Sequence, residues 1–181
     1  MKELRIHGRG GQGSVTAAEL IATAAFESGM YAQAFPAFGV ERRGAPVQAF
    51  VRFSKDKIRL RSQVYEPDYI IVQDSTLIGD VNVFSGMKEW GIAIINTERR
   101  IESEVPEGVR LMTLDATRIA LDVLGVPITN TALLGAFAAA TDVIHLEALE
   151  RALRHRFSGE MAEKNVKAAN LAYNEVRGGT V

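Results

Sequence analysis

Cysteine is absent from this 181-residue sequence. Disulfide bonds, thiolate zinc sites, cysteine nucleophiles and cysteine-ligated iron–sulfur clusters are therefore excluded within the chain. If the protein takes part in electron transfer, another chain must carry the electrons.

The sequence also lacks an excess of charge of either sign, because 21 basic and 22 acidic side chains leave a formal net charge of -1. No overall field therefore favours nucleic acid or an anionic membrane surface. No apolar run is long enough to cross a bilayer, and the first residues do not have the pattern of a secretory signal. We expect a cytoplasmic protein that binds neither nucleic acid nor membrane.

Several catalytic signatures are missing as well. The three histidines, His7, His145 and His155, are too scattered in sequence to indicate a metal site, and we expect each to be a structural or surface residue. The G-x-S-x-G elbow and the P-loop of ordinary NTPases do not occur. The Gly-Asp-Gly that opens the thiamine diphosphate motif is absent too, Gly79-Asp80-Val81 being the nearest approach. We predict no catalytic residue and no metal site, a profile that suits a binding module of a larger enzyme.

What is present indicates a folded α/β protein. Hydrophobic residues make up 47% of the chain and charged residues 24%, as in ordinary globular proteins. Alternating apolar residues predict a strand over Glu3–His7, followed by a glycine-rich turn at Gly8–Gly13. Helical spacing predicts a helix over Ser14–Ser28, and a second strand follows over Tyr31–Phe35. This order is the βαβ opening of a parallel sheet.

The middle of the chain predicts an antiparallel insertion and then further buried strands. Val47–Phe53 alternates in hydrophobicity, and with Ile58–Arg61 it is expected to form a hairpin. Apolar runs predict buried strands at Tyr69–Val72, Ile92–Ile95 and Arg110–Leu114. Polar residues follow each of these strands, so three polar loops should meet at the carboxyl edge of the sheet, where open α/β sheets bind ligands.

The last third of the chain is predicted to be helical, with helices at 115–124, 130–140, 146–157 and 160–176 and with Asn130 as an N-cap. The sequence contains no linker, internal repeat or low-complexity tract. We therefore predict a single domain over residues 1–181. Its fold should be a Rossmann-like three-layer α/β domain with a mostly parallel sheet, an antiparallel hairpin insertion and a helical C-terminal third.

The glycine-rich turn is the first candidate binding site. Gly8–Gly13 satisfies G-x-G-x-x-G between a strand and a helix, where glycines let the backbone approach a ligand and the helix start offers free N–H groups to an anion. The hydroxyl of Ser14 adds a donor. The alternative is that the glycines only allow close packing of helix and sheet. A NAD site would need a carboxylate at the end of the second strand, but Ala34–Ala37 has none, and Glu27 and Glu41 are not well placed.

The second candidate is the loop at residues 38–46, which combines Arg42 and Arg43 with two glycines and sits between prolines. Two guanidinium groups in a stiff loop suit a phosphate or carboxylate, because the planar fork binds oxyanions in bidentate fashion. Equally, these arginines could pair with Glu41 or another acid, or lie in a subunit interface.

At this point the sequence resembles a known family, the gamma subunits of 2-oxoacid:ferredoxin oxidoreductases. The Glu-Arg-Arg-Gly-Ala-Pro segment is the most specific part of the likeness, which spans nearly the whole chain. The similar segments are residues 7–13 (HGRGGQG), 32–36 (AQAFP), 38–46 (FGVERRGAP), 59–62 (RLRS), 66–68 (EPD), 130–135 (NTALLG) and 164–165 (KN). The form of the arginine loop is closer to pyruvate and branched-chain members (the 2-ketoisovalerate enzymes) than to indolepyruvate or 2-oxoglutarate members.

The resemblance implies a subunit that is inactive alone. Alpha and beta subunits would hold thiamine diphosphate, a ferredoxin-like delta subunit would hold [4Fe-4S] clusters, and ferredoxin would accept the electrons. This chain would contribute to coenzyme A binding and to assembly of the complex. The candidate contacts are Arg9, Gly10, Gly11, Gln12, Gly13, Ser14, Glu41, Arg42 and Arg43. The alternatives are a purely architectural subunit and, in third place, a free-standing dinucleotide-binding oxidoreductase.

Overall fold

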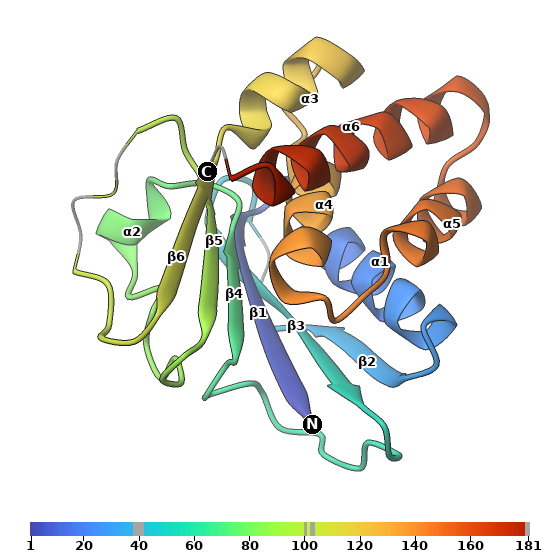
Figure 1. Ribbon diagram of the computed structural model, residues 1–181. Helices are drawn as coiled ribbons and strands as arrows, with labels where there is room; N and C mark the ends of the chain where they lie inside the picture. Colours follow the sequence, from blue (N-terminus) through green and yellow to red (C-terminus); the bar gives the residue numbers. More distant parts are fainter. Residues whose placement is uncertain (38–41, 100, 102–103, 180–181) are drawn as a thin grey trace.

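The computed structural model describes residues 1–37, 42–99, 101 and 104–179. Its strands are β1 (Lys2–Arg9), β2 (Tyr31–Pro36), β3 (Pro46–Ser54), β4 (Tyr69–Val72), β5 (Ile92–Asn96) and β6 (Arg110–Leu114). They form one six-stranded sheet in the order β2-β3-β1-β4-β5-β6 (Figure 1). The strands predicted from the apolar runs are confirmed.

The helices of the described residues are α1 (Ser14–Glu27), α2 (Leu77–Asp80), α3 (Ala116–Leu124), α4 (Asn130–Thr141), α5 (Leu146–Arg156) and α6 (Gly159–Arg177). The predicted helical C-terminal third is confirmed, and each boundary of its four helices agrees within one residue. Helix α4 starts at Asn130 as predicted, but its N-cap is Thr129 and not Asn130.

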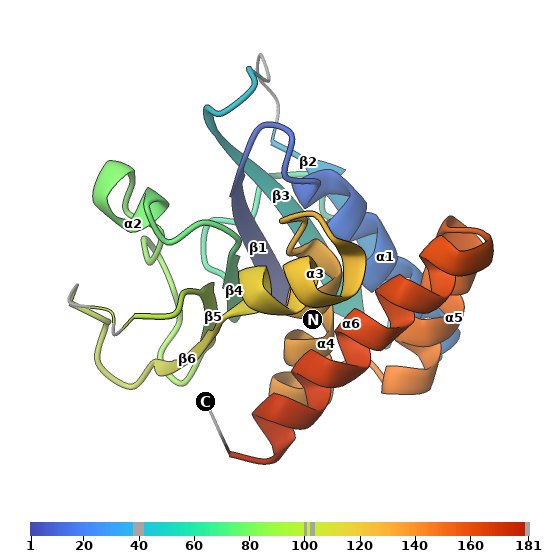
Figure 2. The same ribbon diagram turned by 90° about the horizontal axis from the view of Figure 1, so that it is seen from above.

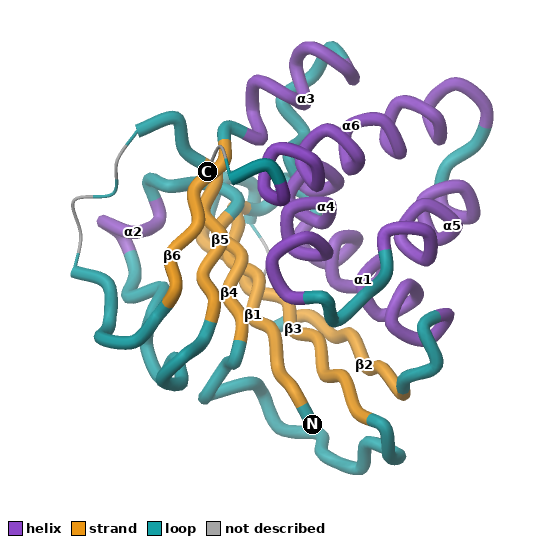
Figure 3. Tube along the Cα trace, in the orientation of Figure 1, coloured by secondary structure: helices purple, strands orange, loops and turns teal. Residues whose placement is uncertain are grey.

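The sheet is mixed, as predicted. β1, β4, β5 and β6 pair in parallel, whereas β3 pairs antiparallel with both β1 and β2. The antiparallel insertion is therefore confirmed, but the partner predicted for it is wrong, because Ile58–Arg61 forms no strand and the arm that pairs with β3 is β2. With β1 and β2 on its two sides, β3 has no free edge at which Ile58–Arg61 could pair. This segment instead lies in the long loop between β3 and β4 (Figure 3).

Two layers of unequal thickness cover the sheet. Helices α1, α4, α5 and α6 lie on one face, and α2 with connecting loops covers the other (Figures 1 and 2). Side chains of a strand alternate between the two faces. Leu4 and Ile6 accordingly pack into the core beneath the helices, while Ile70 and Val72 of β4 pack into a smaller cluster on the α2 side. The expected three layers are present, with the helices concentrated on one side.

Helices α4 and α6 cross in close contact. Gly135 approaches the backbone so closely that a Cβ atom there would lie 2.0 Å from the carbonyl oxygen of Ala169. Beside it, the Thr131 hydroxyl donates to Asn165 Oδ1 at 2.9 Å. Segments 130–135 and 164–165, which resemble the family, therefore include the residues that set the α4–α6 crossing.

Across the residues that the structure describes, no helix is both long enough and apolar enough to span a bilayer.

Candidate functional site

The glycine turn and the arginine loop, which are distant in sequence, lie against one another. Gly10 forms a short parallel bridge with Arg43. The Gly10 N–H donates to Ala45 O at 2.9 Å, and the Gly44 N–H donates to Gly10 O at 3.0 Å. A Cβ atom at Gly10 would lie 2.2 Å from Arg42 O, so only glycine permits this approach. The fold therefore brings the two candidate sites together.

The first turn of α1 offers unused backbone donors next to this junction. Gly11 and Gly13 have positive φ angles of 95° and 76°, and Gly13 is the N-cap, with no side chain capping the helix. Among the described residues, no backbone acceptor meets the N–H groups of Gly13, Ser14, Val15 and Thr16. Together with the positive end of the helix dipole, these groups make a seat for an anion.

The turn at Gly13 also depends on α4. A Cβ atom at Gly13 would lie 2.8 Å from Asn130 Nδ2, and Asn130 is almost fully buried. A side chain at Gly13 would therefore collide with the first residue of α4 as well as strain the backbone. The sequence indicated the glycine but not the partner that requires it.

Three of the predicted donors in the turn are already engaged inside the protein. The Gln12 N–H donates to Arg9 O at 2.9 Å. The Ser14 hydroxyl donates to Gln73 Oε1 at 2.5 Å and is buried, so it does not face a ligand as the sequence suggested. Ser14 can contribute only its backbone N–H. Gly10 likewise uses its N–H in the bridge, which leaves the start of α1 as the main group of free donors.

Arg9 also uses its guanidinium for contacts within the protein. Its Nε donates to Asp74 at 3.1 Å, its Nη2 donates to Asp80 at 2.7 Å and to Thr76 at 2.6 Å, and its Nη1 donates to Gly44 O at 3.3 Å. Arg9 therefore links the glycine turn, the arginine loop and the α2 region. In this arrangement its guanidinium is engaged by acceptors within the protein.

Arg42 and Arg43 are exposed at the mouth of the junction. The ion pairs of this region join Arg9 to acids of the α2 region, and within the described residues none of them involves Arg42 or Arg43. Glu41, the remaining candidate, lies outside the described residues.

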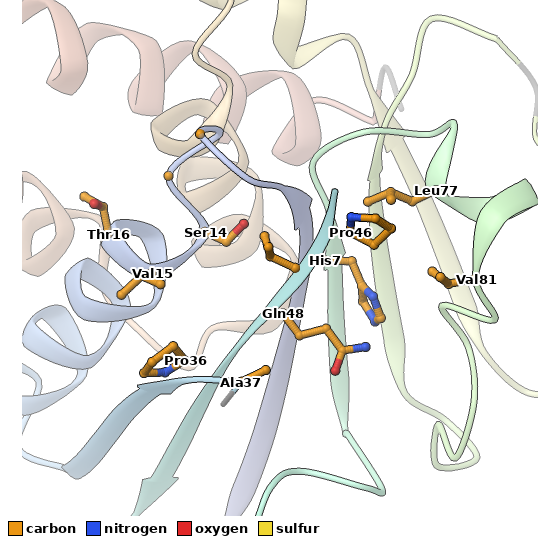
Figure 4. Close-up of a pocket in the computed structure, with 13 residues that line it drawn as sticks. His7, Ser14, Val15, Thr16, Pro36, Ala37, Pro46, Gln48, Leu77 and Val81 are labelled. Carbon is orange, nitrogen blue, oxygen red and sulfur yellow. The ribbon is translucent and has the colours of Figure 1, made fainter. Parts of the chain in front are cut away.

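A cavity of about 480 Å³ lies beside the glycine turn. Figure 4 shows its residues in two groups, one at the start of α1 with the end of β2 and one beside β3 and α2. The lining residues are His7, Gly11, Gly13, Ser14, Val15, Thr16, Pro36, Ala37, Pro46, Val47, Gln48, Leu77 and Val81. The sequence did not indicate the contribution of α2 and Gln48, because only the fold brings these residues to the turn.

His7 is a structural histidine, as expected. It is buried, and its Nε2 accepts a hydrogen bond from Arg5 Nε at 3.0 Å. Burial and the positive charge of Arg5 lower the pKa of His7 to about 3, so its ring is neutral at physiological pH. The guanidinium of Arg5 is fixed in turn by the carbonyl oxygens of Val83 and Ser85.

A second cavity, of about 780 Å³, lies at the carboxyl edge of β4, β5 and β6. The three polar loops meet there as predicted, and Asn96 binds both Gln73 O at 2.9 Å and the Thr117 hydroxyl at 3.0 Å. The charged residues that line this second cavity are Asp74, Glu98, Arg99, Asp115, Arg118 and Asp122. Four carboxylates against two guanidinium groups disfavour a phosphate in this crevice.

Asp74 contributes to this negative charge. Burial alone would raise the pKa of the Asp74 carboxyl, but hydrogen bonds from Thr76 and Gln12 outweigh burial and lower the pKa. Asp74 therefore stays ionised at neutral pH. Within the described residues, no cluster of histidine and acidic side chains could hold a metal ion.

Comparison with known proteins agrees with the sequence motifs. Residues 3–175 match the family described as pyruvate ferredoxin/flavodoxin oxidoreductase. The pyruvate synthase subunit PorC of Methanosarcina barkeri is 61% identical over 179 residues, which cover 98% of each chain. The pyruvate/ketoisovalerate oxidoreductases common subunit gamma of Thermococcus kodakarensis is 53% identical over 180 residues, 97% of each chain.

A solved structure gives the same answer. The pyruvate oxidoreductase subunit PORC of Thermotoga maritima has a TM-score of 0.85 to this fold at 36% identity, covering 96% of this chain and 95% of that chain. The resemblance seen in the sequence is confirmed. The chain belongs to the pyruvate ferredoxin/flavodoxin oxidoreductase family and is of the gamma type.

Proposed function

We propose that this chain is the gamma subunit of an enzyme that oxidatively decarboxylates pyruvate or a branched-chain 2-oxoacid to the acyl-coenzyme A. The relative from Thermococcus kodakarensis carries the name of a gamma subunit common to pyruvate and ketoisovalerate oxidoreductases. A subunit shared by two enzymes cannot choose between their substrates. Substrate selection therefore belongs to other subunits.

Companion chains supply the redox chemistry in this proposal. Alpha and beta subunits hold thiamine diphosphate, and a ferredoxin-like delta subunit holds [4Fe-4S] clusters that pass electrons to ferredoxin. A chain without cysteine can offer such a cluster no thiolate ligand. The complex works in the cytoplasm, and residues 1–181 act in it as a single domain.

The part of this chain is to seat the phosphates of coenzyme A. The observation that supports this role is the Gly10–Arg43 bridge, which joins the backbone of the arginine loop to the glycine turn that leads into the unused N–H groups of α1. Backbone donors at a helix start and paired arginines are complementary to phosphate oxygens. The acid-rich crevice at the carboxyl edge repels the same phosphates, so the two cavities differ in what they can bind.

The earlier candidate residues take separate roles in this seat. Gly11, Gly13 and Ser14 present backbone N–H groups, whereas Gly10 and Gln12 use theirs to hold the turn. Arg9 positions the loop. An architectural role is therefore favoured for Arg9 and Gln12, and a binding role for Arg42 and Arg43.

The test is made on the assembled enzyme, because the proposal concerns a site completed in the complex. Arg42→Ala and Arg43→Ala should each raise the KM for coenzyme A about tenfold or more, since each removes a charge-assisted hydrogen bond. The KM for the 2-oxoacid should change little. Lys167→Ala, which removes an exposed cation of α6, is the matched control.

Size-exclusion chromatography of each variant separates binding from assembly. If both arginine variants assemble normally and keep the KM for coenzyme A of the unmodified enzyme, the phosphate role is wrong. If they no longer assemble, the arginines serve an interface instead.

A further inference from the structure

The loop between β3 and β4 contains a segment with the pattern of a strand but no strand to pair with. In residues 57–61, cations alternate with Ile58 and Leu60, a period typical of β-structure. The segment nevertheless has no regular secondary structure. Within the described part of the chain, no backbone hydrogen bond joins residues 57–61 to another segment.

This segment is also the site of an uncompensated positive charge. Lys55, Lys57, Arg59 and Arg61 are all exposed, and Asp56 is the one acid among them. The ion pairs found in the described residues do not involve any of these four cations; ion pairs elsewhere at this edge join Lys2 and Lys88 to Asp68. Residues 55–61 thus carry a net charge of about +3, whereas the whole chain is nearly neutral.

Exposed aromatic side chains lie along the same edge of the sheet. Tyr65 precedes β4 and Trp90 precedes β5, and because these strands are parallel, both residues lie at the amino edge. The two loops touch, since the Lys88 N–H donates to Pro67 O at 3.1 Å. The exposed fraction is 68% for Tyr65 and 83% for Trp90. Exposed aromatic side chains next to cations are typical of protein interfaces.

Trp90 is unusual in its backbone as well as its exposure. Its φ angle is 64°, in the left-handed region that bulky residues rarely adopt. The described residues leave the indole ring exposed, so burial of the ring does not offset that conformation. Backbone strain of this kind is found most often at functional sites, such as binding sites.

The far end of the cationic segment is held rigidly. Arg52, which is fully buried, donates from Nη2 to Ser62 O at 2.7 Å and to Gln63 O at 3.2 Å. Its Nε pairs with Glu3 at 2.7 Å. The segment is therefore fixed at one end while its backbone remains free, which lowers the entropy lost on pairing with another strand.

We propose that the amino-edge surface, formed by Lys57, Arg59, Leu60, Arg61, Tyr65 and Trp90, docks an acidic extended segment of a companion subunit. Residues 57–61 add to that segment as a strand, with main-chain hydrogen bonds giving affinity and the cations giving charge complementarity. The inference rests on the proposed function, because it requires a multi-subunit enzyme. The surface lies at the opposite end of β1 from the glycine turn, so it is separate from the coenzyme A seat.

Hydrogen exchange of the unmodified protein gives the first test. Amides of residues 57–61 should exchange quickly in the isolated chain, and at least about tenfold more slowly in the assembled enzyme. This measurement needs no variant and cannot fail through misfolding. Equal exchange rates of these amides in the two states would overturn the proposal.

Charge reversal gives the second test, with assembly as its readout. Lys57→Glu combined with Arg59→Glu should lower the affinity of the chain for its companion subunits at least about tenfold, with the difference shrinking at high salt. Arg156→Glu combined with Lys167→Glu, which reverses two exposed cations on α5 and α6, should assemble as the unmodified chain does. Normal assembly of the first variant would show that the cations do not recognise the partner.

The two proposals fail in different ways. Loss of the coenzyme A role would appear as an unchanged KM in the arginine-loop variants. Loss of the docking role would appear as unprotected amides and normal assembly after charge reversal.

Discussion

Arg9 and Asp74 form an ion pair, with Nε and Oδ2 3.1 Å apart, that ties the glycine turn to the loop after β4. The same guanidinium reaches Gly44 O in the arginine loop. A residue that the sequence suggested as a ligand is thus hydrogen-bonded to neighbouring loops within the protein.

Replacing Arg9 should weaken coenzyme A binding without removing a ligand. Arg9→Ala is expected to raise the KM for coenzyme A about fivefold, since the arginine loop loses a hydrogen bond that holds it. Arg9→Lys should not restore it, because an ammonium cannot reproduce the planar set of donors. Asp80→Asn, which keeps an acceptor for Arg9, should have little effect. An unchanged KM in Arg9→Ala would contradict the positioning role.

The α4–α6 crossing should not tolerate a methyl group at Gly135. Gly135→Ala places its Cβ against the backbone of Ala169, so the two helices must move apart. We expect a loss of about 1–3 kcal/mol in the free energy of unfolding, measured with denaturant. Gly79→Ala in α2 meets no atom within 4 Å and should be nearly neutral. Equal stability of the two variants would show that the crossing can relax.

His7 should make stability depend on pH in the acidic range. Burial, with the nearby charge of Arg5, lowers the pKa of folded His7 to about 3, whereas an unfolded histidine titrates near its ordinary value. As the pH falls below the ordinary pKa of histidine, the unfolded chain binds a proton at His7 but the folded chain does not. The free energy of unfolding therefore falls. From pH 7 to pH 5 the loss should be about 2 kcal/mol.

The control for this prediction is His7→Gln, whose amide oxygen can still accept from Arg5 but does not titrate. Denaturant unfolding of this variant should show a smaller loss between the same two pH values. Parallel pH profiles of the two proteins would rule out His7 as the source.

The buried ion pair of Arg52 and Glu3 should be sensitive to the loss of one partner. Arg52→Met leaves the Glu3 carboxylate, which is mostly buried, without its cation, and should lower the free energy of unfolding by about 3–5 kcal/mol. Adding Glu3→Gln removes the isolated charge and should recover much of the loss. A double variant no more stable than Arg52→Met would show that packing, not charge, dominates at this position.

Much of the fold could be read from local patterns. The continuous apolar runs of β4 and β5 and the helical spacing of α1 each determined an element, because the period of the hydrophobic residues follows directly from backbone geometry. Gly29, with a φ angle of 83°, follows the end of α1 in the left-handed region that favours glycine. The one strand that was wrong, Ile58–Arg61, has a valid local pattern but no partner within the described chain.

The candidate site was predicted less completely. The sequence named the glycine turn and the arginine loop, but it could not show that Gly10 and Arg43 would form a bridge. It also could not show that Ser14 and Arg9 would turn to internal partners, since those partners are 35 to 71 residues away in the chain.

By itself, the sequence determined the α/β class, the order of most elements, the family and the exclusion of cysteine chemistry, because composition, periodicity and motifs are local properties of the chain. Only the tertiary structure decided which donors remain free, which cavity is acidic and where the amino-edge surface lies. These depend on contacts between residues that are distant in sequence, and whether a polar group is used internally or left for a ligand is settled only when the strands and helices are packed.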